Sequence, residues 1–176
     1  LTMQDVALLT MAPIRFFGGL DMFTLMAMPF FILAGEIMNR TGITERLVTF
    51  ANTLVGHWRG GLAHANILTS VFFAGLTGAA VSDTAAVGTM LIPAMEKDGY
   101  DTDFAAAVTA SSSIIGPTIP PSNMMVIYGS LMNVSIAGLF AAGFVAGFVL
   151  AGFLMILAAF ISYRRGYAKS VRTSIR

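Results

Sequence analysis

The stretch GLTGAAVSDTAAVGT, residues 75–89, lies in the middle of a long apolar region, yet it is rich in small and hydroxylated side chains around a single acid, Asp83. No other residue between Arg59 and Glu96 is charged. Glycine lowers helix stability, and Ser, Thr and Asp favour helix ends and turns over helix interiors. The stretch therefore predicts a break between two helices inside an apolar segment.

The two parts on either side of this break, residues 62–76 and 84–95, are too short to cross a membrane. At 1.5 Å per residue they reach only ~22 Å and ~18 Å, whereas the hydrocarbon core of a bilayer is ~30 Å thick. One continuous helix weakened by glycine is the alternative, but it would be too long for a single crossing. We therefore expect a re-entrant helical hairpin over residues 62–95, with its tip near the membrane midplane.

The composition of the whole chain is that of a membrane protein. Of its 176 residues, 56% are hydrophobic and only 11% are charged, whereas soluble domains carry about 25% charged residues. The chain has no cysteine and two histidines, which excludes disulfides and Cys-ligated metal sites. We expect an all-α polytopic membrane protein with no nucleic-acid partner. Because the chain starts at Leu1 without a basic leader or a cleavage site, we also expect a fragment of a longer protein.

A second break is predicted at residues 116–123, GPTIPPSN, within a long uncharged run. Its three prolines remove backbone donors and disfavour helix in the residues that precede them. We therefore expect a broken, discontinuous helix over residues 104–133. A continuous transmembrane helix is expected over 137–163, where Gly143 and Gly147 favour close helix packing.

The N-terminal residues 1–61 are expected to belong to a scaffold. Residues 21–40 are mostly apolar and predict one transmembrane helix. Residues 43–58 carry apolar side chains at helical spacing with polar side chains between them, which predicts an amphipathic arm helix lying in the membrane interface. Glu36 comes four residues before Arg40, a spacing that favours a structural ion pair on a helix surface.

The basic residues predict the orientation in the membrane. If the hairpin returns to the side from which it enters, nine of the ten Lys and Arg residues lie on one side and Arg15 lies opposite. By the positive-inside rule, the side with nine basic residues is the cytoplasmic side. The prediction includes a basic cytoplasmic tail at residues 164–176.

The two breaks together predict a binding site at membrane depth. Non-helical backbone inside a bilayer is tolerated where protein or a watery cavity satisfies its polar groups. Helix C-termini present carbonyls suited to a cation, and helix N-termini present amides suited to an anion. The side chains around the breaks carry oxygen atoms of the kind that a hard cation such as sodium accepts. They are Ser82, Asp83, Thr84, Ser111, Ser112, Ser113, Thr118, Ser122 and Asn123.

Structural roles for the same residues stay open. Ser82, Asp83 and Thr84 are good helix N-caps, so capping alone is one interpretation, and capping together with lining of an ion site is the other. The serines at 111–113 either bond back to the preceding helical turn or line the site. His64 is expected to pack against its neighbours or to lie in the interface.

Two motifs, GLTGAAVSDTAAVGT and SSSIIGPTIPPSN (residues 111–123), resemble the large membrane (M, DctM-like) subunit of tripartite ATP-independent periplasmic (TRAP) transporters. The resemblance covers nearly the whole chain. It implies an elevator-type architecture in the bacterial inner membrane, with the hairpin 62–95 and the broken helix 104–133 in a transport domain spanning 62–133. Gly78, Ser82, Asp83, Thr84, Gly116, Pro117 and Ser122 fall on motif positions, and with Thr118 and Asn123 they form the predicted ion- and substrate-binding set.

The resemblance also implies partners and a substrate. A periplasmic solute-binding (P) protein delivers a carboxylated solute of the dicarboxylate or sialic-acid type, and a small membrane (Q) subunit helps to form the scaffold. Sodium is the coupling ion, and no other cofactor is expected. An M subunit has a second, inverted repeat that is not found in this chain, so the chain alone is not expected to transport.

Two other classes of function compete with this interpretation. An intramembrane enzyme is not expected, because His64 and Asp83 fall at opposite ends of a ~22 Å helix and cannot act as a paired base and nucleophile. A structural membrane subunit or a passive channel is the remaining alternative to a secondary transporter.

Overall fold

The computed structural model describes residues 11–14, 16–19 and 23–167, and this part of the chain is helical without any strand. Arg15 and the basic tail beyond Tyr167 therefore lie outside the described residues. The helices are α2 Phe23–Arg40, α3 Ile43–Val55, α4 Gly61–Thr77, α5 Ala80–Lys97, α6 Thr102–Ser112, α7 Ile115–Thr118, α8 Asn123–Met132 and α9 Ile136–Arg164.

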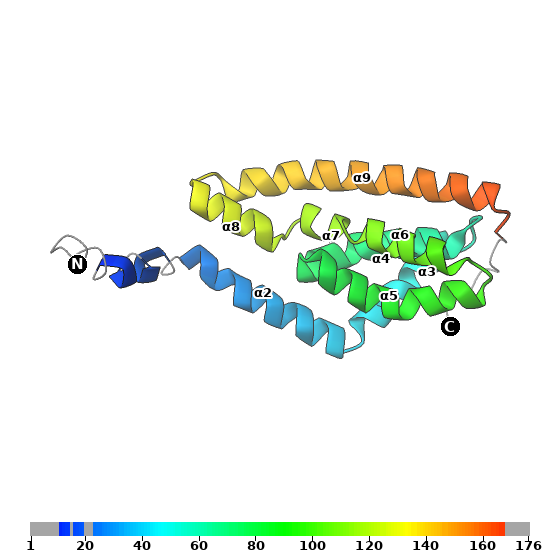
Figure 1. Cartoon of the computed structure of the whole chain (residues 1–176), viewed down its shortest axis with the longest axis horizontal. Coiled ribbons are helices and arrows are strands. Elements are labelled where there is room, and N and C mark those ends of the chain that lie inside the picture. The colour runs from blue at the N-terminus through cyan, green and yellow to red at the C-terminus, as the bar shows by residue number, and fades with distance from the viewer. Residues whose placement is uncertain (1–10, 15, 20–22, 168–176) are drawn as a thin grey trace, which may run out of the picture.

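Helix α4 lies at the centre of the fold. It packs against α2, α3, α5, α6, α7 and α9, and Figure 1 shows α9 running along one side of the molecule with α8, α7 and α6 beside it. The sequence of α4, GLAHANILTSVFFAGLT, has no charged residue, and its polar side chains His64, Asn66, Thr69 and Ser70 are buried. A mainly apolar helix without charge is suited to burial. Its side chains Ala63, Ile67 and Ala74 belong to the largest core cluster.

Helix α9 is the one described helix that is both long and apolar enough to cross a membrane. Its 29 residues correspond to ~43 Å at 1.5 Å per residue. Large apolar side chains such as Phe153 and Ile156 are exposed along it. The crossing expected at 21–40 corresponds to α2, whose last turns carry Glu36 and Arg40 and are less apolar, so this crossing stays a prediction.

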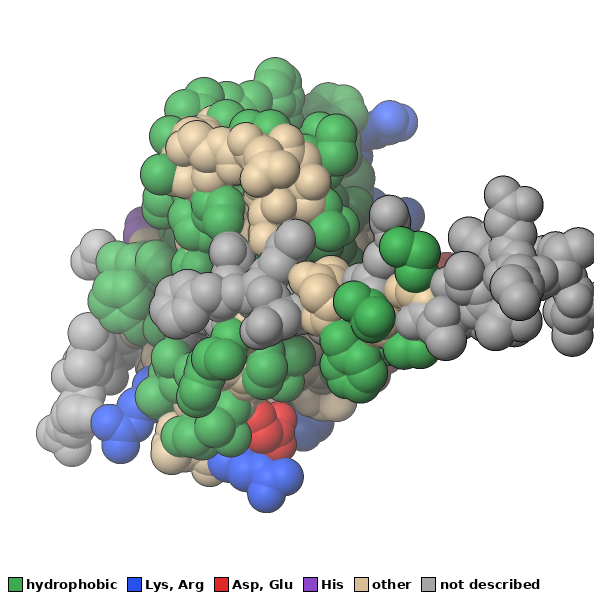
Figure 2. Space-filling view, turned by 90° about the vertical axis from the view of Figure 1, so that its left-hand side faces the viewer, with side chains coloured by type: hydrophobic (Ala, Val, Ile, Leu, Met, Phe, Trp, Pro, Cys, Tyr) green, Lys and Arg blue, Asp and Glu red, His purple; other side chains and the backbone are tan. Residues whose placement is uncertain are grey.

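Many large hydrophobic side chains are exposed on the described surface. Seen from the left-hand side of Figure 1, hydrophobic side chains cover most of the described face, and charged side chains lie at its margin (Figure 2). A surface of this kind is suited to contact with lipid or with other protein rather than with water.

The predicted hairpin is present as two helices, α4 and α5, but the break between them is narrower than expected. Only Gly78 and Ala79 are non-helical, whereas the helices predicted at 62–76 and 84–95 left a break of several more residues between them. Gly78 has a left-handed backbone (φ 58°) and ends α4, and extended Ala79 leads directly into α5. The helices have 17 and 18 residues, about 26 Å each at 1.5 Å per residue.

The predicted broken helix is also present, with a shorter interruption than 116–123. Gly116, Pro117 and Thr118 are helical, because they form the short helix α7. Pro117 is tolerated there because the first turn of a helix needs no backbone N–H donor at that position. The main interruption therefore covers residues 119–122, between α7 and α8.

Small residues of α9 bring it against this interruption. A side chain on Gly143 would lie 2.7 Å from the carbonyl oxygen of Thr118, and one on Gly147 would overlap Ile119. The close packing predicted for this glycine pair is confirmed.

Candidate functional site

The tip of the hairpin meets the interruption of the broken helix. A Cβ atom added to Gly78 would lie 2.9 Å from the carbonyl oxygen of Pro121 and 3.1 Å from the backbone nitrogen of Asn123. A Cβ atom added to Gly116 would lie 3.7 Å from the backbone of Ala79. The two breaks predicted from the sequence are therefore brought together, as backbone packed on backbone.

A cavity of about 280 Å³ opens beside this contact, between α2, the hairpin and the start of α8. Ser82 and Asn123, two residues of the predicted set, line it. The other lining residues are Ile32, Gly35, Glu36, Asn39, Phe73, Ala79 and Ala86. Its size and mixture of apolar and polar walls suit a small organic solute.

The sequence analysis did not predict that α2 lines this cavity. Ile32, Gly35, Glu36 and Asn39 recur at intervals of three, one and three residues, which places them on one face of a helix. The predicted ion pair exists, with Arg40 Nε 2.7 Å from Glu36 Oε1. Both side chains are more than half exposed, so the pair contributes little stability. The polar residues on this face could have been found from their helical spacing.

Asp83 lies apart from the cavity. It is fully buried, and neither of its carboxylate oxygens has a hydrogen-bond partner. The hydroxyl of Ser70 faces the carboxyl group, but the hydrogen bond of Ser70 goes to Ser112 Oγ at 3.1 Å. Ser82, the preceding residue, is exposed, because consecutive residues of a helix point in different directions.

The capping interpretation of the 82–84 stretch is wrong. The N-cap of α5 is Ala79, and no side chain caps this helix end. Thr84 Oγ1 bonds back to the carbonyl oxygen of Ala80 at 2.9 Å. The helix begins earlier than expected because left-handed Gly78 ends α4 sharply and α5 begins after one extended residue, Ala79. Whether Ser82, Asp83 and Thr84 bind an ion stays a prediction.

On the side of the broken helix, Ser122 is buried and caps α8, accepting a hydrogen bond from Met125 N–H at 3.4 Å. Thr118 Oγ1 donates to the carbonyl oxygen of Ile114 at 2.8 Å. Ser113 bonds back within α6 to the carbonyl oxygen of Ala110, as one of the two interpretations predicted.

Buried polar side chains form hydrogen bonds between α4 and α6. Asn66 Nδ2 donates to Thr109 Oγ1 at 2.7 Å, and Ser112 Oγ lies 3.3 Å from Asn66 Oδ1. Ser70 joins them through its bond to Ser112. Asn66 and Ser70 are four residues apart, and Thr109 and Ser112 are three apart, so each pair shares a helix face. This spacing is readable in the sequence, although it was missed there.

His64 has the packing role predicted for it. Its Nδ1 lies 2.9 Å from the carbonyl oxygen of Gly60, and its ring packs against that of Trp58 at 5.6 Å between centroids. It lies far along α4 from the hairpin tip and forms no part of the site.

A helical hairpin whose tip abuts the interruption of a neighbouring helix is an arrangement that is found in helical membrane transporters. The whole chain, residues 1–176, matches the family model of the tripartite ATP-independent periplasmic transporter, DctM component. The chain belongs to this family, whose members are transporter permeases and not enzymes, as the sequence predicted.

Curated relatives agree with this assignment. The chain is 46% identical to the sialic acid TRAP transporter large permease protein SiaM of Vibrio cholerae over 90% of its length and 37% of the relative. It is 42% identical to the 2,3-diketo-L-gulonate large permease YiaN of Escherichia coli, over 89% of the chain and 36% of the relative. It is 36% identical to the C4-dicarboxylate large permease DctM of Rhodobacter capsulatus, over 99% and 43%. The chain thus spans less than half the length of these relatives.

Proposed function

We propose that this chain is part of the large permease subunit of a secondary active importer, which carries a small carboxylated organic solute across the bacterial inner membrane. The contact between the hairpin tip and the broken helix, at Gly78 and residues 121–123, carries the proposal. Interrupted helices that meet in this way hold substrate and coupling ion in many transporters. The adjacent cavity is large enough for a small solute.

The solute class rests on the relatives. Those named above are permeases for sialic acid, 2,3-diketo-L-gulonate and C4-dicarboxylates, which are all carboxylated organic acids. The backbone amides at the start of α8 suit a carboxylate. The solute is delivered by a periplasmic binding protein, and a small membrane subunit completes the complex.

Sodium is the proposed coupling ion. The C-terminal carbonyls of α4 and α7 end beside the tip contact, where they carry partial negative charge. Of the three predicted side-chain ligands at 82–84, the carboxylate of Asp83 is the proposed one, because it is buried and neither of its oxygens has a hydrogen-bond partner. Ser82 faces the cavity instead, and the Thr84 hydroxyl bonds back to Ala80. A site with one carboxylate and several neutral oxygens favours a monovalent ion over a divalent one.

We further propose that α4 and α5 form a re-entrant hairpin in an elevator-type carrier. Each helix of the hairpin is ~26 Å long against ~43 Å for α9, and Figure 1 shows the hairpin tip ending short of the α8–α9 connection. A tip that stops inside the membrane places non-helical backbone there. Such backbone is tolerated where it is buried in protein or lines a watery cavity, as a binding site does.

The experiment that tests the function is solute uptake into vesicles. The complete permease, its small membrane subunit and its binding protein are reconstituted together, and a sodium gradient is imposed. Uptake against the solute gradient that depends on sodium is the expected result. Downhill flux that ignores the sodium gradient would favour a passive channel instead, and no flux would favour a structural subunit.

A further inference from the structure

Two arginines at the C-terminal end of α9 lie on exposed aromatic rings. The guanidinium of Arg164 lies 6.0 Å from the ring centre of Phe160. The guanidinium of Arg59, from the α3–α4 connection, lies 5.3 Å from the ring centre of Tyr163. Both rings are more than half exposed. Because Phe160 and Tyr163 are three residues apart, they share a face of α9, and the two guanidiniums are held at the same part of the surface.

Neither of these guanidiniums is neutralised by a neighbouring acid. Within the described part of the chain, the ion pairs join Arg40 to Glu36 and Arg165 to Asp101. An aromatic ring attracts a guanidinium to its face without cancelling the positive charge. Arginine can also bind a phosphate group through two N–H donors at once. We call Arg59, Phe160, Tyr163 and Arg164 the arginine patch.

An apolar cavity of about 100 Å³ adjoins the arginine patch, between α4, α6 and α9. Leu157 and Ile161 of α9 line it, together with Ala107 of α6. Leu157 comes three residues before Phe160, and Ile161 comes three residues before Arg164. Residues at this spacing are neighbours on a helix surface, so the cavity and the patch lie next to each other along α9.

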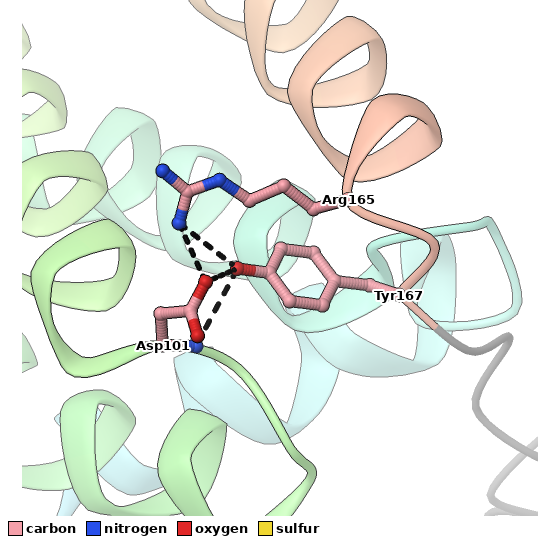
Figure 3. A network of polar contacts seen from close by, with 3 residues as sticks. All are labelled: Asp101, Arg165 and Tyr167. Atoms are coloured by element: carbon pink, nitrogen blue, oxygen red, sulfur yellow. Dashed lines mark hydrogen bonds and ion pairs between the residues drawn. The ribbon is translucent and has the colours of Figure 1, made fainter.

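Arg165 lies at the end of this cavity. Its guanidinium is 5.8 Å from the ring centre of Phe104, which lines the cavity. Its Nη1 donates a hydrogen bond to Asp101 Oδ2 at 2.6 Å, and Figure 3 shows this contact joining the end of α9 to the segment before α6. Because Asp101 neutralises Arg165, the unneutralised charge beside the cavity comes from Arg59 and Arg164.

A ligand for both features needs an anionic group and an apolar chain. The cavity is beside α9, the described helix that is long and apolar enough to cross a membrane, so the bilayer itself can supply such a ligand. The positive-inside rule predicts that this end of α9 is cytoplasmic, and the cytoplasmic leaflet carries anionic lipids that bind to basic pockets between transmembrane helices.

We propose that the arginine patch and the adjoining cavity bind one anionic phospholipid. Its phosphate lies on Arg59 and Arg164, and part of an acyl chain occupies the cavity between α6 and α9. This site goes beyond the proposed transport function, and it requires the membrane location of the chain but no step of transport.

The charge of the ligand is tested by counting bound lipid. The complete permease, purified with its small membrane subunit, is incubated with anionic phosphatidylglycerol or with zwitterionic phosphatidylcholine, and native mass spectrometry measures the lipid retained. We expect a clear preference for phosphatidylglycerol. Arg59→Gln and Arg164→Gln should each weaken its binding about fivefold, the effect expected for one basic residue near an anionic surface. Arg40→Gln is the matched control, because this guanidinium is already paired with Glu36.

The acyl chain has its own pair of variants. Ala107→Phe places a large ring in the cavity, whereas Ala106, the preceding exposed residue of α6, lies outside the cavity lining. We expect Ala107→Phe to weaken phosphatidylglycerol binding threefold or more and Ala106→Phe to leave it unchanged. If Ala107→Phe does not insert, Ala107→Leu makes the same comparison with a smaller side chain.

Three results would overturn the proposal. Equal retention of the two lipids by the wild-type permease would show that the patch does not select an anion. Equal effects of Arg40→Gln and the patch variants would show that net charge alone acts. Loss of the small membrane subunit from the purified complex with Ala107→Phe or Ala107→Leu would show that protein fills the cavity. Since lipid binding is measured without uptake, failure of the transport function would appear only in the vesicle experiment.

Discussion

At the scale of single residues, the site depends on a glycine whose role is steric. Gly78 combines a left-handed backbone with close approach to the backbone of residues 121–123. The sequence predicted that the small residues of this stretch allow a break, but it could not tell which one makes the contact. Asp83, the one acid of the stretch, is buried inside the hairpin, while its neighbour Ser82 faces the cavity.

The steric role of Gly78 can be separated from its backbone conformation. Gly42 also has a positive φ, 75°, but a Cβ atom added there would meet no other atom within 4 Å. Both Gly→Ala changes strain a left-handed residue by roughly 1 kcal/mol. Gly78→Ala must also push Pro121 and Asn123 away, so we expect it to abolish most uptake, while Gly42→Ala keeps most of it. Equal uptake by the two variants, measured at equal membrane abundance, would remove the tip contact from the site.

The carboxylate of Asp83 has a separate test. Asp83→Asn keeps the shape of the side chain and removes its charge, so it should raise the sodium concentration for half-maximal uptake about tenfold, as the loss of ~1.4 kcal/mol of binding would do. Asp103→Asn is the matched control, because Asp103 is an exposed acid in the first turn of α6, and its sodium titration should stay at wild type. A wild-type titration for Asp83→Asn as well would show that this carboxylate does not act on the cation.

At the scale of elements, the sequence predicted the hairpin, the broken helix and the glycine packing of α9, because each has a local signal in helix breakers or small residues. The sequence predicted both breaks to be longer than the structure shows. Side-chain propensity marks Ser82 and Thr84 as helix ends, but both are helical, in a helix that packs against α4, α6 and α7. The hydrogen bond between Tyr167 and Asp101 was not predicted, because it joins residues 66 positions apart.

The interruption between α7 and α8 gives a prediction at this scale. Pro120→Ala together with Pro121→Ala restores backbone donors and good helix formers to residues 119–122. We expect helix to extend across the interruption and to withdraw the carbonyl of residue 121 from Gly78, so uptake should fall by about tenfold or more. Membrane abundance, measured by immunoblot, should fall much less. A parallel loss of uptake and abundance would assign the prolines to folding.

At the scale of the whole molecule, the α3–α4 connection and the α5–α6 connection both lie at the C-terminal end of α9. Arg59, in the α3–α4 connection, stacks on Tyr163 of α9 at 5.3 Å, and a side chain on Gly60 would overlap Ser162. The ion pair between Asp101 and Arg165 brings the α5–α6 connection to the same end of α9 (Figure 3). The opposite end of α9 is the α8–α9 connection, which contains the exposed residue Val134. If the hairpin does not cross the membrane, both connections and the end of α9 lie on the same side. The positive-inside rule makes this side cytoplasmic, because most of the basic residues lie there.

Cysteine labelling tests this topology in the intact permease. Arg59→Cys and Lys97→Cys flank the hairpin, and both side chains are exposed, so a membrane-impermeant thiol reagent should reach both from the cytoplasmic side alone. Val134→Cys, at the far end of α9, should react from the periplasmic side and serves as the control for reagent access. The reasons are length and charge. Each helix of the hairpin is ~17 Å shorter than α9. If the hairpin crossed the membrane, the basic residues that gather at the Arg165 end of α9 would be divided between two compartments. Labelling of residues 59 and 97 from opposite sides would make α4 and α5 part of a membrane crossing, and the tip contact would then need another explanation than a site at the membrane midplane.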